Sequence, residues 1–336
     1  MPMTPDVGHL EGRTIFVTGG AGFFGRHFAE AVLDHTRETK IVVYSRDEQK
    51  HARMAEYLRR HRDRLRFRLG DVRDPDRLRT ALWKSDMVIH AAALKRVDDT
   101  AMHPYELIKT NCTGTQNVLE AALDAGAKKV LVISSDKGVL PANPYGATKF
   151  LAERLAIAWN AVSFARGQIV SCLRWGNVLG STGSALHVFR RVIRAGEPIT
   201  LTDGTMTRFW LSADQAVEGL CHVLRIMRGG EVFVYKTPAA PVGYLPAALA
   251  SEAPVRYVAK RPGGEKIHEV LLSEHEADRA VELDDMYVIE PDWPLPAERE
   301  PWKGRALPEG FRYASDTAVQ LRVEELAQMA AEVPDE

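Results

Sequence analysis

The chain has 336 residues, of which 45% are hydrophobic, and a formal net charge of −1. This length is sufficient for one large or two small domains with a substantial core. The near-zero charge argues against nucleic acid or an anionic membrane as a partner. Three cysteines without metal-ligand spacing predict free buried thiols in a reducing compartment and no metal site. The N-terminal residues lack an apolar signal core, and no apolar run approaches membrane-spanning length, so we expect a soluble, cytoplasmic protein.

A glycine-rich turn follows the first predicted strand. Residues 14–18 form a short β-branched apolar run, typical of a buried parallel strand. Gly19, Gly22 and Gly25 come next and open a helix with apolar spacing. Such glycines let backbone N–H groups approach a pyrophosphate at a helix N-terminus. The strand before and the helix after favour a dinucleotide site over a tight turn without a ligand.

The second predicted strand, residues 41–44, ends at Ser45 and Arg46. An acid at this position would bond the ribose 2′-OH of NAD. A hydroxyl and a guanidinium instead suit a 2′-phosphate, so the sequence predicts NADP. The alternative for Arg46 is an exposed loop arginine. A charged surface helix is expected over residues 47–60.

Two further strands contribute to the same predicted edge of the sheet. Asp71 and Val72 follow the strand at residues 65–69, where an acid can accept from the adenine amino group. The alternative role for Asp71 is a helix N-cap, for which Asp74 is better placed. The strand at residues 87–90 runs into Ala91, Ala92 and Ala93, whose small side chains allow close approach to a cofactor. His90 is predicted to be a packed strand-end residue.

Strand and helix alternate as far as residue 166. A helix is expected over residues 104–125, where Asn111 is a poor helix former and is predicted to bond something specific. A strand at residues 128–133 and a helix at residues 145–166 follow. The alternation predicts an α/β fold with a doubly wound parallel sheet and ligands at the carboxyl ends of its strands.

Titratable residues cluster between this strand and this helix. Tyr145 and Lys149 stand four residues apart, on one face of the predicted helix. A cation beside a phenol favours the phenolate, so Tyr145 is a candidate base near neutral pH. Ser135 can hold a substrate oxygen, and Asp136 and Lys137 add an acid and a base. A solvated helix face is the alternative, which the preceding glycine pattern disfavours.

Beyond residue 170 the sequence predicts a smaller substrate-binding domain. After a strand at residues 168–174, Asn177 lies in a glycine-rich loop and is expected to contact substrate rather than only shape a turn. Arg208 precedes a helix that starts near Ser212, and its guanidinium matches a diphosphate; a surface ion pair is the alternative. Another strand is expected over residues 231–235 and an amphipathic helix over residues 315–331. We divide the chain into 1–175 for the cofactor, 176–300 mainly for the substrate with a return to the main sheet, and 301–336 as an extension.

With these motifs in order, the chain resembles the extended short-chain dehydrogenase/reductases. TGGAGFFG, HAAALKRV, SSDKGVLPANPYGATK, RWGNVLGSTGS, MTRFWLS and RPGGEKIHE together resemble the inverting UDP-N-acetylglucosamine 4,6-dehydratases of polysaccharide biosynthesis. The likeness covers about residues 13–290. It implies tightly bound NADP, regenerated in each turnover, a UDP-sugar substrate and a homo-oligomer, either a dimer or a hexamer.

The resemblance also implies roles for residues. Tyr145 would be the oxidation base and Lys149 its cofactor-bound partner, with Asp136, Lys137 and Ser135, where the family usually has Thr, completing the catalytic set. The implied cofactor contacts are Gly19, Gly22, Phe23, Phe24, Gly25, Ser45, Arg46, Asp71, Val72, Ala91, Ala92, Ala93, Lys95, Tyr145, Lys149 and Asn177. The implied substrate contacts are Lys95, Asn177, Val178, Gly180, Ser181, Arg208, Arg261 and Glu265.

Two departures from the family pattern affect the sugar pocket more than the chemistry. Asp98 and Ala101 stand where the family usually has a proline and an acid. An extra glycine follows Gly263, before Glu265, and could shift the ribose contacts.

The expected reaction is loss of water from UDP-N-acetylglucosamine, giving a 4-keto-6-deoxy sugar with C5 inverted. Lys137 would take the C5 proton, which requires burial or the nearby Lys95 and Lys149 to lower its pKa. One alternative is a UDP-sugar 4-epimerase, which needs only Ser135, Tyr145 and Lys149. Another is a non-catalytic dinucleotide-binding regulatory protein; such proteins typically lose the Tyr or the Lys.

Overall fold

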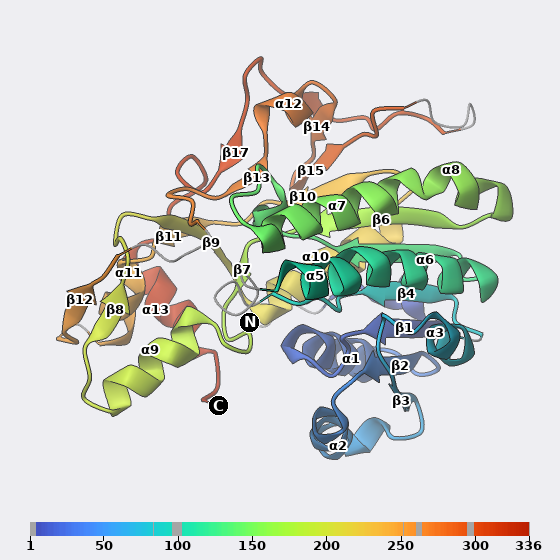
Figure 1. Ribbon diagram of the computed structural model, residues 1–336, viewed down its shortest axis with the longest axis horizontal. Coiled ribbons are helices and arrows are strands. Elements are labelled where there is room, and N and C mark those ends of the chain that lie inside the picture. Colours follow the sequence, from blue (N-terminus) through green and yellow to red (C-terminus); the bar gives the residue numbers. More distant parts are fainter. Residues whose placement is uncertain are drawn as a thin grey trace.

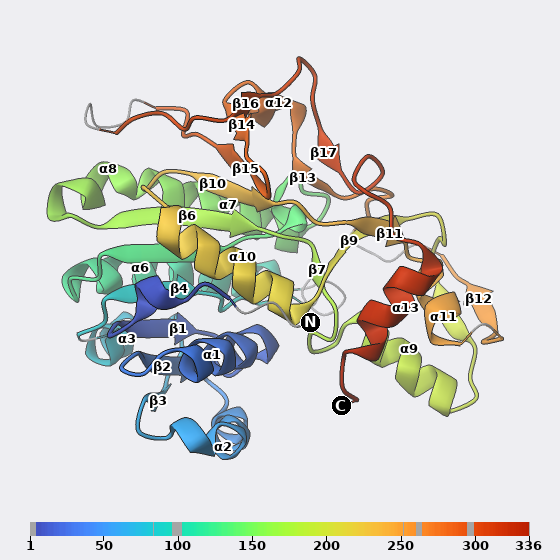
Figure 2. The same cartoon turned by 180° about the vertical axis from the view of Figure 1, so that it is seen from behind.

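The structure is a computed structural model that describes residues 5–82, 84–95, 103–250, 252–259, 264–293 and 299–335. A large sheet with helices on both faces forms the main body, and a smaller lobe with α9, α11 and α13 lies at one end (Figure 1). Helices α6 and α7 cover one face of the sheet, while α1 and α10 cover the other (Figure 2). This arrangement confirms the predicted α/β fold with a doubly wound sheet.

The order of the main sheet is β16-β14-β15-β10-β6-β5-β4-β1-β2-β3. Its strands from β3 to β10 pair in parallel, whereas β15, β14 and β16 join antiparallel. The segment β3-β2-β1-β4-β5-β6 has the strand order of dinucleotide-binding folds, whose ligand crevice lies where the order reverses, between β1 and β4. The strands of this sheet are β1 Thr14–Thr18, β2 Lys40–Ser45, β3 Leu65–Leu69, β4 Met87–His90, β5 Lys129–Ile133, β6 Ile169–Arg174, β10 Val232–Tyr235, β14 Ala280–Glu282, β15 Met286–Ile289 and β16 Arg305–Ala306.

Three small sheets complete the strand pairing. They contain β7 Asn177–Val178, β9 Thr207–Leu211 and β11 Ala239–Pro241; β8 Ile199–Leu201 and β12 Val255–Tyr257; and β13 Val270–Leu272 and β17 Tyr313–Ala314. The α-helices are α1 Phe23–His35, α2 Glu48–Tyr57, α3 Pro75–Leu82, α5 Pro104–Leu107, α6 Gly114–Asp124, α7 Pro144–Ala158, α8 Asn160–Ser163, α9 Ala185–Arg194, α10 Ala213–Ile226, α11 Tyr244–Leu249, α12 Glu274–Ala277 and α13 Val323–Ala331. The main sheet takes strands from both sides of residues 175 and 300, and the division into domains at these points stays a prediction.

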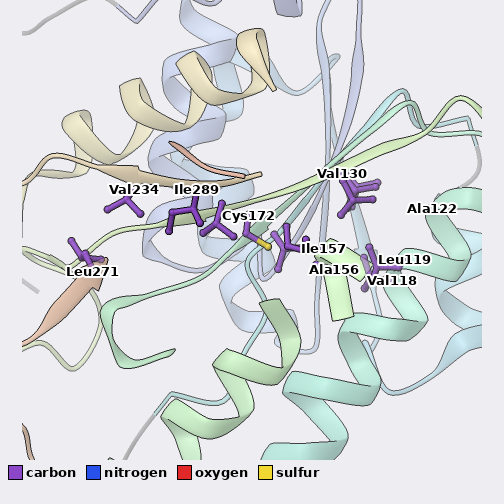
Figure 3. Close-up of a cluster of buried hydrophobic side chains, with 14 of the residues drawn as sticks. Val118, Leu119, Ala122, Val130, Ala156, Ile157, Cys172, Val234, Leu271 and Ile289 are labelled. Carbon is purple, nitrogen blue, oxygen red and sulfur yellow. The ribbon is translucent and has the colours of Figure 1, made fainter. Parts of the chain in front are cut away.

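The central strands are apolar because helices cover both of their faces. Figure 3 shows part of this core, where Val118 of α6 and Ile157 of α7 lie against Val130 of β5 and Cys172 of β6. All three cysteines are free and buried, as predicted. None of the described helices is long and apolar enough to span a membrane.

Three predicted helices differ from those observed. The helix expected over residues 104–125 contains a π-helical segment at Ile108–Thr113. The Asn111 side chain in this segment bonds both backbone groups of Leu94, which confirms that it has a specific partner. The helix expected over residues 145–166 ends at Ala158 and is followed by the short α8 and a 3₁₀ turn.

The helix expected over residues 315–331 begins only at Val323, so that prediction is wrong in its first half. Tyr313 and Ala314, just before this segment, pair with β13. The Ser315 hydroxyl is then buried 2.6 Å from the hydroxyl of Thr207. Tertiary pairing therefore determines the conformation here, and local helical propensity does not.

Candidate active site

The glycine-rich turn lies at the point where the strand order reverses. Gly19 has φ +66°, and a Cβ there would lie 3.0 Å from the backbone nitrogen of Ala92, which follows β4. A Cβ on Gly25 would lie 2.3 Å from the Gly20 carbonyl oxygen. The turn therefore requires glycine. Its Gly22 is the N-cap of α1, whose first-turn N–H groups suit a pyrophosphate.

Phe23 and Phe24 form the start of α1 beside this turn. The Phe24 ring packs on Trp175, with 5.0 Å between centroids. On the other side of the crevice, the backbone N–H groups of Ala91 and Ala92 both donate to the Thr18 hydroxyl. Ala93 is half-buried just beyond them, and Lys95, the last residue before an undescribed stretch, is exposed.

His90 is packed, as predicted. It is 3% exposed and bonds the hydroxyls of Thr18 and Thr115 through its two ring nitrogens. Burial lowers the pKa of His90 to about 3, so the ring is neutral at physiological pH. Its role is to join β4 to β1 and α6 beneath the crevice.

Arg46 stands at the end of β2 with its side chain 53% exposed and NH1 3.4 Å from Asp71 Oδ2. Asp71 also accepts from Arg73, at 3.0 and 2.7 Å. Burial raises the pKa of Asp71, but Arg73 outweighs this and holds it below its ordinary value. Asp74 caps α3 through the N–H of Arg77, as predicted. The Arg46 guanidinium therefore has exposed surface beside the end of β2.

The neighbouring predicted cofactor residues have protein partners. The Ser45 hydroxyl lies 2.7 Å from His51 Nε2. Val72 is buried and its carbonyl accepts from Asn117. Both residues line the edge at which β2 and β3 end.

The residues after β5 form a bonded set. Ser135 caps a 3₁₀ turn at Asp136–Gly138 by accepting from the Lys137 N–H. The Ser135 hydroxyl donates to Asp136 Oδ1 at 2.6 Å, and Lys137 Nζ donates to Asp136 Oδ2 at 2.7 Å. Asp136 is 1% exposed. The turn thus places a hydroxyl, a carboxylate and an ammonium within one hydrogen-bonded chain.

Tyr145 lies in the first turn of α7, which Asn143 caps. Burial raises the pKa of Tyr145 to about 12, although the Lys137 charge and a hydrogen bond with Ser135 oppose this rise. In the protein alone, the pKa of Tyr145 is therefore not near neutral, contrary to the expectation from its spacing to Lys149. Lys149 was expected to supply the opposing charge, but its Nζ donates to the Ile133 carbonyl at 2.5 Å, and burial lowers its own pKa.

Lys137 lies between two carboxylates, because its Nζ is also 3.0 Å from Glu269 Oε1. Burial lowers the pKa of Lys137, but Asp136 and Glu269 outweigh burial and raise it above its ordinary value. The expected lowering by Lys95 and Lys149 is wrong; the neighbouring cation that lowers it is Arg208. In the resting protein Lys137 is thus an ammonium.

Sequence reasoning missed two charged residues of this site. Glu269 is 2% exposed. Its carboxylate forms ion pairs with three basic side chains: Lys137, Lys266, whose Nζ is 3.3 Å away, and Arg208, whose Nε is 3.7 Å away. Lys266 Nζ also donates to the carbonyls of Asp136 and Val139, which ties this segment to the 3₁₀ turn at Asp136–Gly138. Both residues lie in the RPGGEKIHE stretch, from which the sequence analysis predicted only Arg261 and Glu265 as site residues.

A cavity of about 580 Å³ adjoins these charges. Its polar lining comprises Lys137, Asn143, Asn177, Thr200, Thr202, Asp203, Arg208, Glu265, Lys266 and Glu269, and its apolar lining includes Val188, Phe189, Val192, Trp210, Val242 and Val258. The cavity therefore joins Asn177, Arg208 and Glu265, predicted from separate motifs, to the Lys137 ammonium.

Val178, Gly180 and Ser181, also predicted to contact substrate, follow the cavity-lining Asn177 in the chain. Val178 of β7 pairs with β9. Gly180 has φ +76°, and a Cβ there would lie 2.4 Å from Val333, beyond α13. Ser181 forms the next turn. Arg261 lies outside the described residues, as do Asp98 and Ala101.

Arg208 is fixed within the protein and is not a surface ion pair. Its side chain is 11% exposed, and NH1 donates to the carbonyls of Thr207 and Ile267. A guanidinium held in this way presents a preorganised charge to the cavity.

A doubly wound sheet, a glycine turn at its switch point, and Ser135, Tyr145 and Lys149 after β5 are features of an extended short-chain dehydrogenase/reductase. Within this class the chain belongs to the polysaccharide biosynthesis protein family, whose model matches residues 15–291.

The names of similar proteins include two different activities. The chain is 36% identical over 319 residues to a UDP-N-acetylglucosamine 4,6-dehydratase (inverting) from Campylobacter jejuni, covering 93% of this chain and 95% of that protein. It is 37% identical over 290 residues to a UDP-glucose 4-epimerase from Rickettsia rickettsii, covering 83% of each.

Solved structures agree with the fold. Pen from Bacillus thuringiensis superposes with a TM-score of 0.87 at 30% identity, covering 96% of this chain and 99% of that one. The dTDP-glucose 4,6-dehydratase DesIV from Streptomyces venezuelae, solved with NAD and TYD bound, gives a TM-score of 0.65 at 26% identity, covering 75% and 86%.

Proposed function

We propose that the protein is a nucleotide-sugar 4,6-dehydratase that acts on UDP-N-acetylglucosamine and inverts C5. The observation that carries the proposal is the Asp136–Lys137 pair, bonded at 2.7 Å between the dinucleotide crevice and the cavity. Its support from relatives is the 36% identity to a dehydratase of this name.

The first chemical step is oxidation at C4. Tyr145 takes the proton of the 4-hydroxyl, which Ser135 helps to position. A nicotinamide cofactor held by the glycine turn and Arg46 would supply a hydride acceptor for C4 and a hydride donor for C6. For Tyr145 to act near neutral pH its pKa must fall well below 12, and the Lys137 charge and the Ser135 hydrogen bond already act in that direction.

The elimination step needs an amine base and a carboxylic acid. In the resting protein Asp136 is a carboxylate and Lys137 is an ammonium. The reactive pair, a carboxylic acid and a neutral amine, contains the same number of protons and differs only in which residue holds one of them. A proton that moves across their 2.7 Å hydrogen bond converts one pair into the other without exchange with water. Displacement of water by substrate favours the neutral pair, because burial penalises separated charges.

Lys137 then removes the C5 proton, which the 4-ketone has made acidic. Asp136 protonates the 6-hydroxyl, which leaves as water. Return of hydride to C6 and of a proton to C5 completes the product. If that proton arrives on the face opposite to Lys137, C5 is inverted.

We propose NADP as the cofactor, because Arg46 offers an exposed guanidinium at the end of β2. The DesIV structure contains NAD, so this choice requires its own test. We also propose a homo-oligomer, since α7 exposes Phe150, Leu151 and Leu155, which are 41%, 48% and 38% exposed.

A UDP-sugar 4-epimerase is the second candidate, and the Rickettsia relative favours it. Epimerisation uses Ser135, Tyr145 and Lys149 and leaves the buried Asp136–Lys137 pair without a chemical role. We therefore place it second.

The direct test is the mass of the sugar nucleotide after incubation with UDP-N-acetylglucosamine. Loss of one water supports the dehydratase, whereas an unchanged mass with an inverted C4 supports the epimerase. A protein that is thermally stabilised by NADP but not by the sugar nucleotide, and that produces neither product, would be a dinucleotide-binding regulator.

A further inference from the structure

Glu269 has no assigned role in the chemistry above, yet both its backbone and its side chain have partners in the protein. Its backbone N–H donates to the Ser315 hydroxyl at 2.8 Å, and its carbonyl accepts from the Ser315 N–H at 2.8 Å. The side chain is 2% exposed and lies 3.0 Å from Lys137 Nζ. Hydrogen bonds to Ser315 fix the backbone of Glu269, and the ion pair with Lys137 fixes its carboxylate.

Three cations and one further carboxylate lie around Glu269. Lys137, Lys266 and Arg208 face it from the catalytic turn, its own segment and β9, while Asp136 supplies the other negative charge. The Glu269 charge also acts on Tyr145 of α7, whose pKa it raises. When a proton passes from Lys137 to Asp136, both of these become neutral. Glu269 then keeps Lys266 and Arg208 as counter-ions, so its charge is constant through the cycle.

This geometry gives Glu269 a task in both states of Lys137. A neutral amine has two N–H groups and one lone pair. Proton transfer along the hydrogen bond to Asp136 leaves the lone pair facing Asp136, so the amine turns about its Cε–Nζ bond before it acts on substrate. After this turn one N–H lies on Glu269 and the other on Asp136, and these two contacts set the direction of the lone pair. Without Glu269, the flexible lysine chain has a single anchor, Asp136, whose own protonation changes in the reaction.

We propose that Glu269 is a positioning residue that holds the Lys137 side chain in its charged and neutral forms and, in the neutral form, directs the amine lone pair at the proton to be removed from substrate. The inference rests on the proposed dehydratase function. It assigns to Glu269 an effect on proton removal, with little effect on substrate binding.

The test compares Glu269→Gln, Glu269→Asp and the control Glu231→Gln in dehydration of UDP-N-acetylglucosamine across pH. Glu231 is a matched control, because it is 0% exposed and paired with Arg299 at 2.7 Å, away from the site. We expect Glu269→Gln to lower kcat about a hundredfold and to change KM less than about threefold. Its alkaline pH limit should move down by about one pH unit, because loss of the negative charge lets Lys137 give up its proton more easily.

The other variants separate positioning from stability. Glu269→Asp keeps the charge, so its pH limit should stay in place while kcat falls about tenfold. Glu231→Gln should lower the melting temperature without moving the pH profile. If Glu269→Gln behaves like Glu231→Gln, Glu269 is structural and the inference fails. If the unmodified protein yields no dehydrated product, the proposed function fails, and this inference with it.

Discussion

The side chains of Asp136 and Lys137 bond to each other although the residues are adjacent in sequence, with 2.7 Å between Oδ2 and Nζ. Adjacent side chains on a strand would point to opposite faces. The 3₁₀ turn at Asp136–Gly138, capped by Ser135, brings them to one side. This turn therefore creates the pair of groups that a dehydratase needs and an epimerase does not.

Asp136→Asn should separate dehydration from oxidation. The amide preserves the shape of the side chain but cannot protonate a leaving hydroxyl, so we expect loss of water to slow by about 10²–10⁴-fold. Binding of the sugar nucleotide should change little. Product mass measures the first effect and calorimetric titration the second. Asp76→Asn, at a side chain 94% exposed, is the control; equal activity of the two variants would refute the role of Asp136.

Tyr145→Phe should slow every redox step. The variant lacks the only phenol that α7 presents beside Ser135 in the described chain, and we expect kcat to fall by about 10²–10⁴-fold. The melting temperature should not fall, because burial of a phenol is replaced by burial of an apolar ring. A variant that keeps more than a tenth of the activity would show that another group is the base.

Arg46→Ala should weaken NADP binding about tenfold or more and leave NAD binding unchanged, because only NADP carries the 2′-phosphate that a guanidinium holds. Fluorescence titration with each dinucleotide measures the ratio. Arg62→Ala provides a control at a side chain 84% exposed. Equal losses for the two dinucleotides would indicate that Arg46 does not select the cofactor.

The buried Arg174–Glu276 pair should make the free energy of unfolding depend on pH in the acid range. Burial raises the pKa of Glu276, but Arg174, 2.6 Å away, outweighs it and lowers the pKa to about 2. A depressed carboxyl pKa stabilises the fold above the unfolded value of about 4.5, and this stability is lost as pH falls toward 2. The contribution is about 3 kcal/mol.

Glu276→Gln should therefore be less stable than the unmodified protein at pH 7, by up to this amount, and the difference should shrink as pH falls below about 4.5. Urea unfolding at several pH values measures it. A difference that stays constant from pH 7 to pH 3 would contradict the assignment.

Much of the fold was predictable from local patterns. The strands at residues 14–18 and 87–90 match β1 and β4 in their bounds, because buried parallel strands are short apolar runs between polar turns. The strand at residues 65–69 also matches β3, an edge strand in which two arginines alternate with apolar residues. The helix expected over residues 315–331 failed because Ser315 and its neighbours pair with segments far away in sequence. No local pattern contains that information.

The site was predictable residue by residue but not in its electrostatics. Tyr145, Asp136 and Lys137 were found from spacing and resemblance. The pairing of Lys137 with Glu269, 132 positions later, depends on how β13 and β17 bring residue 269 to the catalytic turn. The sign of the Lys137 pKa shift therefore could not be obtained from the sequence.

The most direct test of this account is to incubate the protein with UDP-N-acetylglucosamine in D₂O and to locate deuterium in the product by proton NMR. We predict a product that has lost one water and carries a 4-ketone, a C6 methyl group, deuterium at C5 and coupling constants of the inverted sugar. A product of unchanged mass, epimerised at C4 and without deuterium at C5, would contradict the account.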